Sequence, residues 1–95
     1  MRISREIRLF LTSIIRKALP NSEIYLFGSR ADDNRKGGDI DVLVLDEHTL
    51  TLRQKLEITA AFHKECGDQK LDIVSFTHKD THPFKKIALT SAVPL

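Results

Sequence analysis

The chain has 95 residues, a formal net charge of +2 at pH 7 and one cysteine. This length fits one domain, residues 1–95, with a modest core, and the lone cysteine excludes an internal disulfide. The small net charge argues against a nucleic-acid-binding or membrane-binding surface. Because no apolar run is long enough for a membrane span and charges interrupt the N-terminal segment, we expect no signal peptide and a cytoplasmic location.

Hydrophobic periodicity predicts seven segments that alternate between helix and strand. In chain order they are a helix at 4–19, a strand at 23–27, a short helix at 29–35, a strand at 39–45, a four-turn helix from 51 to the stop at Gly67, a strand at 70–76 and a short helix with Pro83 in its first turn. The order α-β-α-β-α-β-α predicts an α/β (α+β) sandwich with a small, mixed, three-stranded sheet and flanking helices. Residues 91–95 are expected to be frayed.

Capping residues set the expected helix ends. Ser4 is the predicted N-cap of the first helix, and Thr51 with Gln54 forms a capping box at the second. Asp80 or Thr81 is the expected cap of the last helix. The side chains predicted to face the core are Leu52, Leu56 and Ala60, broadened by Ile58 and Phe62, on the second helix, and Phe84, Ile87 and Ala88 on the last. The polar side chains expected at the surface are Lys79, Lys85, Lys86, His48, His63, His78 and His82.

The most informative pattern lies around the first two strands. The first strand ends in Gly28-Ser29, nine residues follow, and the second strand opens with Asp39-Ile40-Asp41. Side chains alternate along a strand, so Asp39 and Asp41 point to one side. Two close carboxylates repel each other unless a cation lies between them, and carboxylate oxygens favour hard ions such as Mg²⁺. The pattern therefore predicts a magnesium site and a phosphate-bearing substrate.

Asp72 is the candidate third carboxylate. It lies between Leu71 and Ile73 in an apolar strand, where an isolated charge is costly without a partner. If this strand lies beside the second, Asp72 can join Asp39 and Asp41. An ion pair with Lys70 or Arg30 is the alternative.

Glycines and polar groups between these strands suit a phosphate. Gly28 permits a close backbone approach and a positive φ, while the Ser29 hydroxyl and nearby N–H groups are donors. Gly38 also fits a close approach of the backbone to a ligand. The candidate cations for a phosphate oxygen are Arg30, Arg35 and Lys36, with solvated loop positions as the alternative.

The pairing of Gly28-Ser29 with Asp39-Ile40-Asp41 resembles the nucleotidyltransferase superfamily that includes DNA polymerase beta. More narrowly, the run from Leu26 to Ala31, Leu-Phe-Gly-Ser-Arg-Ala, is similar to that of the minimal nucleotidyltransferases (MNT), which include MntA-like antitoxins of HEPN/MNT toxin–antitoxin modules. The resemblance extends roughly from Ile3 to Phe76.

This resemblance implies a Mg²⁺-dependent enzyme that transfers AMP from ATP to an acceptor hydroxyl. Asp39, Asp41 and Asp72 would bind two Mg²⁺ ions, and Asp72 would also activate the acceptor. The residues that would hold the nucleotide phosphates are Gly28, Ser29, Arg30 and Gly38. The implied partner is a separately encoded, helical HEPN-type toxin, which the chain would neutralise by nucleotidylation.

The sequence also departs from the family pattern. Arg30-Ala31-Asp32-Asp33 stands where many relatives have Arg-Ala-Arg-Gly or Arg-Ala-Lys-Gly, and Gly38 stands where Ser is common. These differences leave open a catalytically inactive protein that binds nucleotide or partner and neutralises by contact. A third alternative, nucleotidylation of an aminoglycoside, is disfavoured because this length leaves no room for an acceptor-binding domain.

Overall fold

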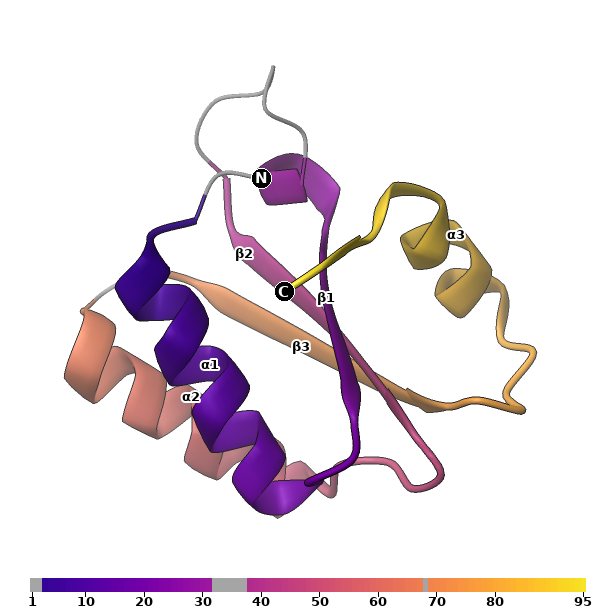
Figure 1. The fold of residues 1–95 in the computed structure, drawn as a ribbon, viewed down its shortest axis with the longest axis horizontal. Coiled ribbons are helices and arrows are strands. Elements are labelled where there is room, and N and C mark those ends of the chain that lie inside the picture. Colours follow the sequence, from indigo (N-terminus) through magenta and orange to yellow (C-terminus); the bar gives the residue numbers. More distant parts are fainter. Residues whose placement is uncertain (1–2, 32–37, 68) are drawn as a thin grey trace.

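Helices and strands alternate along the chain in the computed structural model, as the sequence predicts. The structure describes residues 3–31, 38–67 and 69–95, apart from the side chain of Ser29. The elements are α1 (Arg5–Ala18), β1 (Glu23–Phe27), the 3₁₀ turn η1 (Gly28–Ala31), β2 (Ile40–Asp46), α2 (Leu52–Cys66), β3 (Leu71–Thr77), α3 (Pro83–Ser91) and β4 (Val93–Pro94) (Figure 1). The α+β class and the element order are confirmed, with η1 where the short helix was expected.

The four strands form one mixed sheet in the order β3-β2-β1-β4. β2 runs antiparallel to β1 and parallel to β3. The prediction of three strands and a frayed C-terminus is wrong, because Val93 and Pro94 pair with β1. The Leu95 N–H then donates to the carbonyl of Ile24 over 2.9 Å. A two-residue edge strand that contains proline carries no periodic signal in the sequence.

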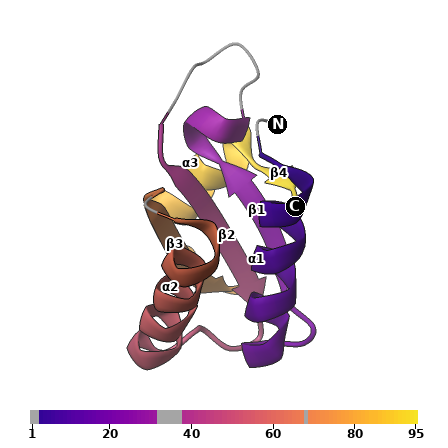
Figure 2. The same cartoon turned by 90° about the vertical axis from the view of Figure 1, so that its left-hand side faces the viewer.

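The two faces of the sheet are covered differently. α1 and α2 lie on one face and α3 lies on the other (Figure 2). The larger core, beneath α1 and α2, consists of Leu11, Ile15, Leu19, Ile24, Leu26, Ile40, Val42, Val44, Leu50, Ile58, Phe62 and Leu71. The smaller cluster, on the α3 face, consists of Phe27, Leu43, Leu45 and Ala88. Since side chains alternate along strands, Asp41 and Asp72 share the α3 face.

The predicted caps of α1 and α2 are confirmed, but the predicted core line of α2 is wrong. Leu52 and Leu56 are 73% and 61% exposed, and Ala60 is exposed, whereas Ile58 and Phe62 are buried. Residues that are two positions apart in a helix point about 200° away from each other around its axis. The row of side chains that contains Leu56 and the row that contains Ile58 therefore cannot both face the sheet. The row with the β-branched and aromatic side chains is the buried one.

The start of α3 differs from the expectation. Its N-cap is His82, whose Nδ1 accepts the Phe84 N–H at 3.1 Å. Asp80 instead accepts the His82 N–H, over 2.9 Å. Pro83 occupies the first turn as predicted, which leaves the preceding residue as the cap. Ala88 faces the core, but Phe84 and Ile87 are exposed.

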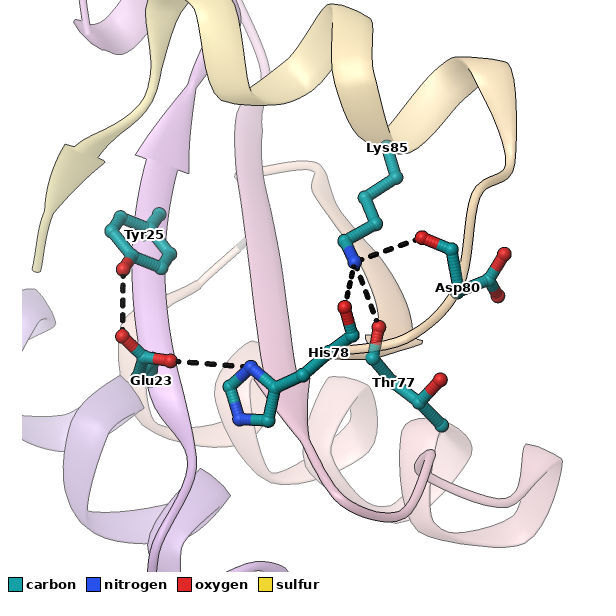
Figure 3. A network of polar contacts seen from close by, with 6 residues as sticks. All are labelled: Glu23, Tyr25, Thr77, His78, Asp80 and Lys85. Carbon is teal, nitrogen blue, oxygen red and sulfur yellow. Dashed lines mark hydrogen bonds and ion pairs between the residues drawn. The ribbon is translucent and has the colours of Figure 1, made fainter.

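Lys85 is buried, against the prediction of a solvated helix face. The residue is 8% exposed, and its Nζ donates to the carbonyls of Thr77, His78 and Asp80 over 3.0, 2.7 and 2.9 Å (Figure 3). These acceptors satisfy all three donors of the ammonium group. Lys85 therefore fastens α3 to the turn after β3. His78 joins this turn to β1, because its Nδ1 lies 3.4 Å from Oε2 of Glu23.

We expect Lys85→Ala to destabilise the fold strongly. Three carbonyls lose a charged donor, and the expected loss is about 2 kcal/mol or more, a fall in Tm on the order of 10 °C for a domain of this size. The matched control is Lys86→Ala, since Lys86 is adjacent and exposed. Thermal unfolding followed by circular dichroism measures both variants. Equal Tm values for the two variants would contradict the structural role of Lys85.

Candidate functional site

The predicted site residues come from three segments that meet at one end of the sheet. Phe27, the last residue of β1, pairs with Asp41 of β2. Asp41 in turn lies beside Asp72 in the parallel register of β2 and β3. Gly28 follows Phe27 directly, so the strand ends place Gly28, Asp41 and Asp72 together. Asp72 was expected to join the other carboxylates only if its strand lies beside the second strand. This arrangement of the two strands is confirmed.

Asp41 lies at the centre of the acidic group. Its pKa is raised above the usual value, first by burial, then by the charges of Asp72 and Asp39 and by a hydrogen bond with Asp72, while Lys70 acts in the opposite direction. Two carboxylates this close repel each other, and a bound cation would relieve that repulsion.

Asp72 has a different environment from the one expected. It was predicted to be a costly charge within an apolar strand, but its side chain is exposed because β3 is an edge strand. The need for a counter-charge therefore comes from its neighbour Asp41 and not from burial.

Asp39 precedes β2 and is paired with a lysine. Its Oδ2 lies 3.6 Å from Nζ of Lys70, and its side chain is 45% exposed. Lys70, which was considered as a partner of Asp72, thus forms an ion pair with Asp39. Among the described residues, no three His, Cys, Asp or Glu side chains are placed to hold a metal ion as they stand. The structure brings Asp41 and Asp72 together and places Asp39 close enough for its charge to act on Asp41.

Gly28 fits tightly against Asp41. Its φ is 72°, and a Cβ atom added there would lie 2.6 Å from Oδ2 of Asp41. Any other residue would collide with the carboxylate in a strained backbone conformation. The Gly28 N–H donates to the hydroxyl of Ser91 at 3.4 Å. Sequence reasoning missed Ser91, which lies 63 residues away in the chain and carries no motif that could have marked it.

The remaining phosphate-binding candidates are only partly described. Arg30 Nε donates to the Gly38 carbonyl at 3.3 Å, which ties η1 to the segment before Asp39. Gly38 has a φ of 89°, as expected of a glycine at a close backbone approach. Ser29 lies in η1. The predictions that fall outside the described part of the chain concern the Ser29 side chain, Asp32, Asp33, Arg35 and Lys36.

The four histidines are exposed, as predicted. A cavity of about 560 Å³, lined by Glu47, Thr77, His78 and Lys79, lies at the opposite ends of β2 and β3. Among its described lining residues only Glu47 carries a carboxylate, so the acidic end of the sheet is the better candidate for chemistry. No described helix is both long enough and apolar enough to span a bilayer.

Known proteins share both sequence and fold with this chain. Residues 11–95 match the profile of the family described as polymerase beta, nucleotidyltransferase. A chain of a mutant MntA–HpeT toxin–antitoxin complex has the same fold, with a TM-score of 0.72 and 23% identity over 98% of this chain and 72% of that chain. A chain from the complex of tri-AMPylated Shewanella oneidensis HEPN toxin with MNT antitoxin has a TM-score of 0.63 and 25% identity, over 93% and 70%.

The matching chains in these complexes are the antitoxins MntA and MNT. A second mutant of the MntA–HpeT complex gives a TM-score of 0.68 and 21% identity over 88% of this chain and 67% of that chain. No curated protein sequence matches significantly.

We expect Asp41→Asn to stabilise the metal-free protein at neutral pH. Because the pKa of Asp41 is raised on folding, the native state binds more protons than the unfolded chain between the unfolded and folded pKa values. The ionisation of Asp41 therefore lowers the free energy of unfolding as pH rises through this window. An asparagine at this position cannot ionise, so the variant does not lose this stability. The gain in Tm should shrink as pH falls towards about 4, the ordinary carboxyl pKa.

Scanning calorimetry in EDTA over a range of pH measures this effect. Asp46→Asn, at the other end of β2, is the matched control. A gain from Asp41→Asn that is independent of pH would contradict a raised pKa of Asp41 in the folded protein.

Proposed function

The chain belongs to the polymerase beta-type nucleotidyltransferase family, and we propose that it transfers AMP from ATP to a hydroxyl group of a HEPN-type partner protein and releases pyrophosphate. The observation that carries this proposal is the close pair Asp41–Asp72 with Gly28 packed against it. Two relatives support the choice of partner, since one was crystallised with HpeT and another with a tri-AMPylated HEPN toxin.

The donor chemistry of the site fits Mg²⁺. Asp39, Asp41 and Asp72 offer only carboxylate oxygens. Burial and the charges of Asp72 and Asp39 raise the pKa of Asp41, and a divalent cation would counter both effects. These three residues would hold up to two Mg²⁺ ions, which supply positive charge at the attacking and leaving oxygens. Lys70 balances the charge of Asp39 when no cation does so.

The other residues have separate roles in the proposal. The Gly28 N–H, the Ser29 hydroxyl, Arg30 and the backbone at Gly38 bind the triphosphate, whose oxygens accept their hydrogen bonds. Asp72 accepts the proton of the attacking hydroxyl. Its exposed position on an edge strand allows an acceptor carried by a protein to reach it.

We expect MgATP to raise the Tm of the protein, and the double substitution Asp39→Asn/Asp41→Asn to abolish this rise. A ligand at about 100 times its Kd stabilises the native state by about 2.7 kcal/mol, which is a shift of several degrees in a domain of this size. Differential scanning fluorimetry with MgATP, Mg²⁺ alone and EDTA measures it. Asp46→Asn should keep the full shift, and a double variant that also keeps it would refute the site.

Transfer to a partner is tested directly by intact-mass spectrometry. The chain is incubated with MgATP and a HEPN-type protein encoded beside it, and we expect the partner to gain one or more AMP units. Asp72→Asn should slow this transfer more than it weakens ATP binding, because its role lies in the chemical step. A stable complex whose partner gains no mass, and whose neutralisation survives all three Asp substitutions, would identify the chain as an inactive binding protein.

A further inference from the structure

The hydroxyl of Ser91 touches the backbone of the candidate phosphate-binding turn. Its Oγ accepts the Gly28 N–H at 3.4 Å and donates to the Ala88 carbonyl at 3.5 Å. Both distances are at the long end of the hydrogen-bond range, so neither bond is strong. Because Ser91 is exposed, its hydroxyl can exchange these partners without leaving a buried group unsatisfied.

The elements that precede and follow Ser91 in the chain fix its position next to Gly28. Ser91 is the last residue of α3, and β4 begins two residues later and pairs with β1. At the start of α3, Lys85 is fastened to the turn after β3, and the Phe84 ring packs edge-to-face on Phe27 with centroids 6.0 Å apart. The position of the hydroxyl beside Gly28 is therefore set by elements that pack independently of any ligand.

Ser91 also lies close to the acidic group, because Gly28 lies between them. A Cβ atom on Gly28 would lie 2.6 Å from Oδ2 of Asp41, and the N–H of the same residue bonds to Ser91. A phosphate group held by the Gly28 N–H therefore comes within reach of the Ser91 hydroxyl. A serine hydroxyl can both accept and donate, so a rotation about its C–O bond is enough to change its role.

We propose that Ser91 is a positioning residue for the polyphosphate of the nucleotide. In the free protein its oxygen accepts the Gly28 N–H. When the nucleotide binds, a phosphate oxygen takes that N–H, and the Ser91 hydroxyl turns to donate to the same phosphate. This inference rests on the proposed function and adds a residue from the C-terminal part of the chain to its nucleotide site.

The test measures the equilibrium affinity of three variants of the full chain for MgATP. Their affinity for AMP is measured by its competition with MgATP. Ser91→Ala should weaken MgATP binding roughly tenfold, the loss expected for one hydrogen bond to a charged group, and should leave AMP binding unchanged. Ser91→Thr keeps the hydroxyl and should restore affinity. Thr90→Ala is the matched control, because the Thr90 hydroxyl donates to the Ile87 carbonyl of its own helix at 2.6 Å. The Tm of all three should equal that of the parent chain.

The outcomes separate this inference from the function on which it rests. If Ser91→Ala binds MgATP as well as the parent chain while Asp41→Asn does not, Ser91 has no role and the proposed function stands. Equal weakening of MgATP and AMP, or a lowered Tm, would show a general structural role and overturn the inference. A parent chain that binds no MgATP would overturn both.

Discussion

The parallel pairing of β2 with β3 sets Asp41 directly beside Asp72, and the candidate site depends on this register. A slip by one residue would turn the apolar side chains of a strand from the core to the other face. Val42 and Val44 lie fully buried under α1 and α2, and removing each from the core costs about 1.5–3 kcal/mol. Hydrophobic packing therefore keeps two carboxylates together although they repel each other. The folded site thus contains an unfavourable interaction that a cation or a proton relieves.

The position of α3 decides which side of this acidic pair stays open. Lys85 holds the start of the helix at the turn after β3, and the ring contact between Phe84 and Phe27 holds the helix over β1 and η1. Val74 and Phe76, which follow Asp72 on the same face of β3, are only partly buried as a result. The nucleotide phosphates and the acceptor would thus approach from different sides, the phosphates at η1 and the acceptor at the β3 edge.

The elements that have a local pattern could be predicted from the sequence. Prediction failed where contacts between residues that are distant in the chain determine the structure. Gly28 and Asp41 could be predicted to lie together because turn, strand and carboxylate spacing all lie within one short stretch. Asp72 could be added to them once its strand was taken to be a neighbour. Lys85 was misplaced because its three acceptors are carbonyls, which have no signature in the sequence. The two-residue strand β4 was missed for the same kind of reason, since only pairing with β1 defines it.

The electrostatics of the site also bear on the choice between an enzyme and a protein that acts only by contact. Three carboxylates meet here, and among the described residues Asp39 forms an ion pair with Lys70. Asparagine at position 41 would keep the shape of the strand and remove the repulsion, so a surface that only blocked a partner would be more stable with it. The acidic group lowers stability in the absence of a counter-charge, and a bound divalent cation would relieve that cost. That balance favours metal-dependent chemistry over a purely steric role.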